Sequence, residues 1–267
     1  MKDFFATQKP RVFAHRGLCL GPAGDSLDEN TLAAFAAAVA SGVDYIETDV
    51  QASKDGVAVL FHDENLNRVL AHPLNPDHLN RPISDFDWIE LQGIELKNGG
   101  LIPSLEQALT AFGQTRFNLD FKVEAAVSPG LEVILRLGVL NRVLVSAFSE
   151  ARRLAMLSKL EQSQRKIVAT SAGSSVVLKS YLLFLVGWSS RFRKTLVGID
   201  AFQIPTGFFG LNLASKRFID ALHRAGVEVH FWTINSTDEM RQLVERGADG
   251  IVTDRADLAI QRFRSPK

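Results

Sequence analysis

The chain has 267 residues, 46% of them hydrophobic, which is enough to bury a large core. Its 30 Lys and Arg balance 30 Asp and Glu, so the formal net charge is zero. The chain has no overall positive charge that would indicate nucleic-acid binding. Any anionic ligand must therefore be bound by local groups. The single cysteine, Cys19, excludes an intrachain disulfide and a cysteine-based zinc site.

The first part of the chain predicts two strands and a helix followed by an irregular segment. Strands are expected at 11–15 and 43–50, with a helix between them at 30–42 that Asn30 caps. A turn at Lys54-Asp55-Gly56 leads into a hairpin partner of the second strand at 57–62. Residues 63–102 are rich in Asn, Pro and Gly and predict little beyond a short helical patch near 83–91.

Helices and strands alternate regularly after residue 102. The predicted helices are 103–112, 128–138, 150–160, 174–192, 214–226, 236–247 and 255–263, and the predicted strands are 116–122, 142–148, 166–171, 196–205, 227–235 and 248–254. About eight strand–helix units in about 250 residues is the size of a (β/α)₈ barrel. A doubly wound open sheet is the alternative, but its usual G-x-G-x-x-G turn is absent after the first strand. A single TIM barrel over 1–267 is favoured.

Polar side chains recur where the predicted strands end. In a barrel these C-terminal strand ends meet on one face, where active sites lie. The residues are His15, Arg16, Glu47, Asp49, His62, Asp63, Asp120, Lys122, Ser146, Trp232, Thr233, Asn235 and Asp254.

Three carboxylates in this set predict a metal site. Glu47 and Asp49 are two positions apart on one strand and share a face, and Asp120 follows on the next strand. Such oxygen ligands suit Mg²⁺ or Ca²⁺. In the alternative interpretation each carboxylate pairs with a nearby cation such as Arg16 or Lys122. We expect Glu47 and Asp49 at the barrel rim, where solvent and a cation offset their repulsion.

Two histidines and two cations complete the predicted site. His15 and His62 are candidates for acid–base catalysis because imidazole titrates near neutral pH. Arg16 and Lys122 supply positive charge for a phosphate group. Together with a metal, these groups predict phosphoryl transfer at a phosphodiester.

Six segments in order resemble the glycerophosphodiester phosphodiesterase family: FAHRG, ENTLAAF, GVDYIETDVQASKDGVAVLFHDENLNR, FNLDFK, FWTIN and GADGIVTD. The block from 43 to 68 is the most specific. The resemblance implies a TIM barrel with a small insertion after the second strand, which matches 63–102. It also implies metal-dependent hydrolysis of glycerophosphodiesters to glycerol 3-phosphate and an alcohol.

The resemblance also implies roles for the site residues. Its metal ligands would be Glu47, Asp49 and Asp120, holding one Mg²⁺ or Ca²⁺. Its acid and base would be His15 and His62, and its substrate contacts would be Arg16, Lys122 and Trp232. Asp120 stands where the family usually has glutamate, and Asp28 where it usually has proline. Two alternatives stay open: a phospholipase D-like enzyme acting on lysophospholipids, and a catalytically silent barrel that binds glycerophosphates.

The apolar stretch 176–188 is too short to span a bilayer. It is expected to be the sixth barrel helix. Its basic flanks also suggest an interfacial segment in peripheral membrane contact, with Leu183 and Phe184 touching lipid. The N-terminal segment lacks the apolar core of a signal peptide, which predicts a cytoplasmic location.

Overall fold

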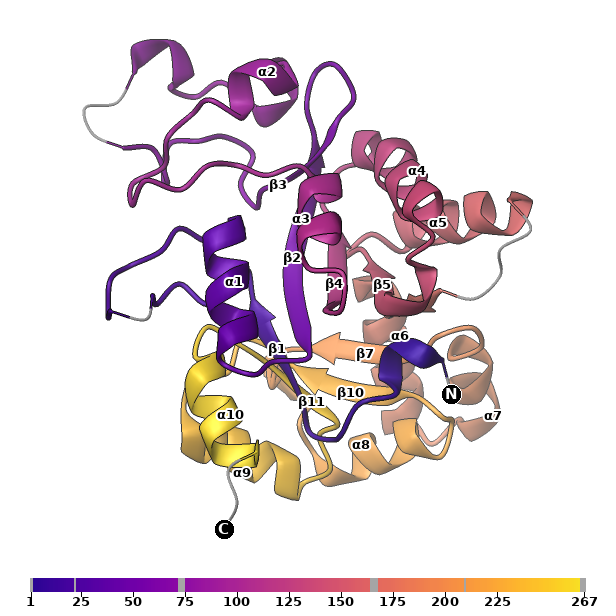
Figure 1. Cartoon of the computed structure of the whole chain (residues 1–267). Helices are drawn as coiled ribbons and strands as arrows, with labels where there is room; N and C mark the ends of the chain where they lie inside the picture. The colour runs from indigo at the N-terminus through magenta and orange to yellow at the C-terminus, as the bar shows by residue number, and fades with distance from the viewer. Residues whose placement is uncertain (1, 22, 72–74, 164–167, 209, 265–267) are drawn as a thin grey trace.

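A computed structural model describes residues 2–21, 23–71, 75–163, 168–208 and 210–264. Eight parallel strands form a nearly closed barrel with helices around it (Figure 1), which confirms the predicted fold. The strand order is β6-β5-β4-β2-β1-β11-β10-β7, and a parallel bridge between Ser171 and Ala201 joins its two ends. The barrel strands are β1 (Arg11–His15), β2 (Tyr45–Ala52), β4 (Arg116–Phe121), β5 (Val143–Ser146), β6 (Ala169–Thr170), β7 (Ala201–Ile204), β10 (Glu228–Phe231) and β11 (Gly250–Thr253).

The helices pack their apolar faces against the outside of the barrel, where they bury the largest hydrophobic core. They are α1 (Leu32–Ala40), α3 (Leu105–Ala111), α4 (Val127–Leu137), α5 (Glu150–Gln162), α6 (Ser174–Leu185), α7 (Ser189–Thr195), α8 (Lys216–His223), α9 (Thr237–Glu245) and α10 (Ala256–Arg264). Short 3₁₀ turns are η1 (Asp3–Phe5), η2 (Pro76–His78), η3 (Ile83–Asp85), η4 (Glu124–Ala126) and η5 (Leu140–Arg142).

A second core fills the barrel toward the N-terminal ends of its strands. Phe4 and Phe5 of η1 join Phe13 and Tyr45 there in a buried aromatic cluster. Strand side chains alternate between the two faces, so Tyr45 is followed on the same face of β2 by Glu47 and Asp49. The buried aromatic cluster therefore lies closer to the N-terminal ends of the strands than Glu47 and Asp49 do.

The segment after β2 forms a small subdomain with a core of its own. β2 extends beyond the predicted end at residue 50, and its last residues pair antiparallel with β3 (Ala58–Leu60). The described residues between 61 and 102 continue from this hairpin beyond the end of β2 (Figure 1). The predicted helical patch near 83–91 consists of η3 and the single-turn helix α2 (Trp88–Leu91).

Several predicted boundaries were wrong. Thr31, not Asn30, caps α1 by accepting a hydrogen bond from the Ala34 N–H. The predicted helix 174–192 is two helices, because Gly187 between them adopts a left-handed φ of 72°. The predicted strand 196–205 narrows to β7, and residues 166 and 167 of another predicted strand lie outside the described residues. A hairpin of β8 (Gly207–Phe208) and β9 (Leu211–Asn212) was not predicted.

Within the described ranges, no helix combines the length and apolar character that crossing a membrane requires.

Candidate active site

A cavity of about 330 Å³ opens at the C-terminal ends of the barrel strands. All eight predicted site residues line it: His15, Arg16, Glu47, Asp49, His62, Asp120, Lys122 and Trp232. A larger hollow of about 750 Å³ lies beside the β8–β9 hairpin and α9, away from the two histidines. The smaller cavity is the candidate site because the charged and titratable groups converge there.

The carboxylates come from β2 and β4, which pair directly. The register places Asp49 beside Asp120 and Glu47 beside Asn118. Glu47 and Asp49 are only 8% and 2% exposed, so the expectation that they lie at a solvated rim was wrong. They lie in the middle of β2, because this strand continues beyond them into the hairpin with β3.

Lys122 and Arg16 neutralise part of this buried charge. Lys122 Nζ lies 2.8 Å from Asp49 Oδ1 and 2.7 Å from Asp120 Oδ2, and Arg16 Nε lies 3.2 Å from Asp49 Oδ2. Burial alone would raise the pKa of Asp49, but Lys122 and Arg16 outweigh it and hold this pKa below its usual range. For Asp49 and Asp120 the structure therefore shows the pairing with cations that the alternative interpretation predicted.

Glu47 is different, because it forms no ion pair with Lys or Arg within the described part of the chain. Its nearest cationic partner is His15, whose Nε2 lies 4.0 Å from Glu47 Oε2. Burial, followed by the charge of Asp49, raises the pKa of Glu47 to about 7. An added cation would stabilise the charged form of this carboxylate.

The chemistry of the donor set fits a hard divalent cation, since all three candidate ligands are carboxylates on neighbouring strands. Among the described residues, however, no three His, Cys, Asp or Glu side chains are already grouped as a metal site. The Lys122 ammonium bridges Asp49 and Asp120 where a shared cation would otherwise neutralise them.

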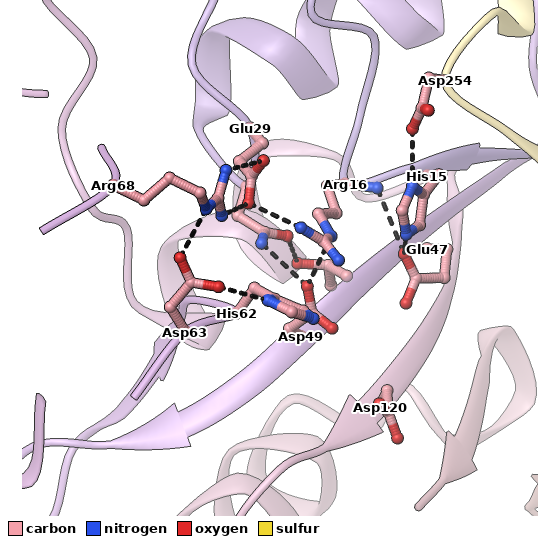
Figure 2. A network of polar contacts seen from close by, with 12 residues as sticks. His15, Arg16, Glu29, Glu47, Asp49, His62, Asp63, Arg68, Asp120 and Asp254 are labelled. Carbon is pink, nitrogen blue, oxygen red and sulfur yellow. Dashed lines mark hydrogen bonds and ion pairs between the residues drawn. The ribbon is translucent and has the colours of Figure 1, made fainter. Parts of the chain in front are cut away.

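Each candidate catalytic histidine is held by an aspartate through its Nδ1 atom. His15 Nδ1 lies 2.6 Å from Asp254 Oδ1, and His62 Nδ1 lies 2.6 Å from Asp63 Oδ1 (Figure 2). In both rings Nε2 is the nitrogen left for proton transfer. Burial lowers the pKa of His15, but the hydrogen bond with Asp254 and the charge of Glu47 outweigh it, so this pKa is raised.

Arg16 is fixed by its backbone as well as by its side chain. It has a left-handed φ of 57°, uncommon for a residue with a Cβ. Its N–H donates to the Glu47 carbonyl at 2.9 Å, and its own carbonyl accepts the Asn30 N–H at 2.9 Å. Asn30 also donates from Nδ2 to Asp49 Oδ2 at 3.0 Å. The residue predicted as a helix cap thus supports the site.

The opposite wall of the cavity is apolar. Phe148 and Trp232 meet edge to face there, with ring centroids 5.8 Å apart. Helix α6 and the β8–β9 region supply further apolar lining residues, among them Val177, Leu178, Tyr181, Phe208, Leu211 and Leu213. The cavity therefore combines charged and apolar lining residues.

Sequence reasoning gave no role to several residues of the site. Glu29 and Arg68 connect its charged groups, and both lie in segments that carried the family resemblance. Asn118 lines the cavity, and its buried Oδ1 has no hydrogen-bond partner among the described residues. Its place on the same face of β4 as Asp120 was an available signal. Apart from Trp232, the residues of the apolar wall had no such signal, because they come from segments far apart in the sequence.

Known proteins with this architecture identify the family. The model of the glycerophosphoryl diester phosphodiesterase family matches residues 15–258. A probable glycerophosphodiester phosphodiesterase 2 from Mycobacterium tuberculosis is 36% identical over 247 residues, covering 92% of this chain and 88% of that protein. A glycerophosphodiester phosphodiesterase from Caldanaerobacter subterraneus is 27% identical over 270 residues, covering 96% of this chain and 98% of that protein.

A solved structure gives the same answer for the fold. A phosphodiesterase from Oleispira antarctica, in complex with the product sn-glycerol-3-phosphate, has a TM-score of 0.71 at 23% identity and covers 96% of this chain and 97% of that chain. The family match spans the barrel and the charged residues that line its cavity. The chain therefore belongs to the glycerophosphoryl diester phosphodiesterase family and is a phosphodiesterase of the hydrolase class.

Proposed function

We propose that the protein hydrolyses glycerophosphodiesters to glycerol 3-phosphate and an alcohol. The observation that carries this proposal is the convergence of two histidines, an arginine, a lysine and three carboxylates on one cavity. The names of the relatives and the product bound to the Oleispira protein support the same substrate class.

In this proposal Arg16 and Lys122 bind the phosphate oxygens, and His15 and His62 transfer protons through Nε2. The raised pKa of His15, in which two carboxylates outweigh burial, favours it as the proton donor to the leaving alcohol. His62 then acts as the base. Arg16 offers a planar guanidinium fork and Lys122 a point charge, so the two cations can contact different oxygens of the phosphate.

We also propose a divalent cation, Mg²⁺ or Ca²⁺, held by Glu47, Asp49 and Asp120. The support is the oxygen-only donor set and the raised pKa of Glu47, which reflects burial and the adjacent Asp49. When bound, such an ion withdraws charge from the phosphate oxygens. Lys122, which now bridges two of these carboxylates, would be released toward the substrate.

Activity on glycerophosphodiesters with different alcohols tests the reaction, with glycerol 3-phosphate measured as the product. His15→Ala and His62→Ala should each lower kcat about 10²-fold or more, the usual scale of acid–base catalysis. His78→Ala is the matched control, because His78 lies in the insertion and does not line the cavity. Unchanged turnover in both His15 and His62 variants would refute their roles.

The metal is tested by activity and by melting temperature. EDTA should remove activity, and Mg²⁺ or Ca²⁺ should restore it. The same ions should raise the melting temperature of the wild type, because they bind only the folded state, and should have a much smaller effect on Glu47→Gln. Full activity in EDTA together with no thermal shift would exclude the metal.

A second candidate substrate is a lysophospholipid, which the apolar wall of the cavity favours. An acyl chain beside the phosphodiester could occupy the space lined by Leu178 and Tyr181. Leu178→Asp should then lower kcat/KM for lysophosphatidylcholine more than for glycerophosphocholine. Leu154→Asp, an exposed leucine on α5, is the control. An equal effect of Leu178→Asp on both substrates would refute the acyl site.

We further propose peripheral contact of 176–188 with an anionic membrane. Large apolar side chains are exposed on and after α6 at Leu178, Leu182, Leu185, Val186 and Trp188. Basic residues flank them at Lys179, Arg191, Arg193 and Lys194. Leu183 and Phe184, which were expected to touch lipid, are partly buried and pack against the barrel core, so the exposed Leu182 and Leu185 are the better test of this contact.

Flotation with anionic vesicles checks this contact. The double change Leu182→Ser and Leu185→Ser should reduce flotation, whereas Leu154→Ser should not. Equal flotation of the two variants would rule out this surface. A cytoplasmic location stays a prediction, which cell fractionation would check.

A further inference from the structure

We propose that Glu29 and Arg68 are positioning residues that fix the geometry of both His62 and Arg16. The two form a bidentate ion pair between the segment before α1 and the insertion that follows β3 (Figure 2). Neither lines the cavity, so their effect must pass through the residues that do. The catalytic part of this inference rests on the proposed function, whereas its geometric part concerns His62 itself.

One end of the network holds His62. Arg68 Nε donates to Asp63 Oδ2 at 2.6 Å, and Asp63 Oδ1 lies 2.6 Å from His62 Nδ1. An aspartate held through one oxygen can rotate about its side-chain bonds, but the arginine fixes the second oxygen. Arg68 therefore determines the direction in which Asp63 orients the imidazole and hence its Nε2.

The other end holds Arg16. Arg68 Nη1 and Nη2 donate to Glu29 Oε2 and Oε1 at 2.9 and 2.6 Å, and Glu29 Oε1 also accepts from Arg16 Nη1 at 2.8 Å. Glu29 thus divides its charge between two guanidinium groups. Without Arg68, the whole charge of Glu29 would act on Arg16 and compete with the substrate phosphate for it.

This arrangement differs from simple anchoring of the insertion. Asp28, the preceding residue, also joins this segment to the insertion by accepting the N–H groups of Asn98 and Gly100 at 2.9 and 3.0 Å. Within the described ranges, Asp28 forms no hydrogen bond or ion pair with His62 or Arg16. The two adjacent acidic residues therefore separate an anchoring role from a positioning role.

The kinetic experiment compares Arg68→Ala with Asp28→Ala. Arg68→Ala should lower kcat by roughly 10- to 100-fold, the scale known for partners that orient functional groups. It should also raise KM, because Arg16 is drawn toward Glu29. Methylguanidine should restore part of the activity of Arg68→Ala. Arg68→Lys should be less active than the wild type, because an ammonium lacks the guanidinium fork. Asp28→Ala should lower the melting temperature without the same loss of kcat.

A surface ion pair provides the matched control for the charge itself. Arg136 and Glu106 form an equally bidentate pair on the helical exterior. Arg136→Ala should leave kcat and KM unchanged. If Asp28→Ala lowers kcat as much as Arg68→Ala does, or if Arg68→Ala has no effect on turnover, Glu29 and Arg68 only anchor the insertion.

A second measurement does not depend on any substrate. The ¹⁵N NMR shifts of the histidine side chains, with the His62 signal assigned by its loss in His62→Gln, report which ring nitrogen carries the proton. In Arg68→Ala the Nδ1–H form of His62 should lose population relative to the wild type, and in Arg136→Ala it should not. An unchanged His62 spectrum would overturn the proposal even if the enzyme is active, and a changed one would support it even if the assigned substrate is wrong.

Discussion

Asp254 controls His15 at the scale of single residues. It accepts from His15 Nδ1 and is itself held by Asn235, whose Nδ2 lies 2.7 Å from Asp254 Oδ2 and whose Oδ1 accepts the Asp254 N–H at 2.9 Å. Burial lowers the pKa of His15, and the contact with Asp254 is the largest of the effects that raise it. The histidine at the end of β1 therefore keeps its proton to a higher pH than an ordinary imidazole.

Asp254→Asn should lower the pKa of His15, because the amide keeps a hydrogen-bonding group but loses the negative charge. With His15 as the proton donor, the alkaline limb of the kcat profile should move to lower pH. The measurement is kcat against pH for a glycerophosphodiester. Asp238→Asn, an exposed change in α9, is the control, and an alkaline limb that does not move would contradict the assignment of His15.

The predicted site residues were recognisable because they follow a simple rule. The side chains share one face of neighbouring parallel strands, and such strands bring them to one end of a barrel. The residues are His15, Glu47, Asp49 and Asp120. The supporting residues obey no such rule. Asn30 has the composition of a helix cap, and its contact with Asp49 depends on a left-handed backbone that its sequence does not specify.

At the scale of elements, the insertion is stabilised by its own core and holds Arg68 in place. Phe86 is fully buried there, and the Arg81 guanidinium stacks over its ring at 3.8 Å. Phe86→Ala should lower the stability of the insertion by about 3–5 kcal/mol, as large-to-small changes of buried aromatic residues do. We expect faster proteolysis within 63–102 and lower activity, because Arg68 would no longer be fixed.

The comparison variant is Met156→Ala, which makes a cavity in the core outside the barrel. It should lower the melting temperature without selective cleavage in the insertion. Cleavage in 63–102 at the wild-type rate in Phe86→Ala would show that the insertion does not depend on its own core.

Element boundaries were predicted less well than element order. The apolar pattern across 174–192 is continuous enough to predict one helix. The chain instead breaks at Gly187, a left-handed residue between two helices whose Phe184 and Phe192 both pack on the barrel. The short β8–β9 hairpin contains too few residues to show a period of two. Eight strand–helix units could still be counted, because each hydrophobic run is separated from the next by a turn.

At the scale of the whole molecule, the two ends of the barrel carry different electrostatics. At the cavity end the buried Glu47 has no Lys or Arg partner among the described residues, whereas at the opposite end the buried Asp249 is paired with Lys9 and His223. There Asp249 lies 2.5 Å from Lys9 Nζ and 2.7 Å from His223 Nε2, and it accepts the Val229 N–H at 2.8 Å. Burial raises the pKa of Asp249, but Lys9, Val229 and His223 outweigh it and hold this pKa below its ordinary value.

This depressed pKa fixes the sign of a pH effect on stability. Because the folded pKa of Asp249 is below its unfolded value of about 3.9, its contribution is present above that pH and disappears as pH falls through the folded pKa. Urea unfolding of the metal-free protein between pH 6 and pH 3 should therefore show a steeper loss of unfolding free energy in the wild type than in Asp249→Asn. Asp220→Asn, at a surface pair with Lys216, should change that slope little, since solvent screens exposed pairs. Parallel slopes for the wild type and Asp249→Asn would mean that the stability of the protein does not depend on the charge of Asp249.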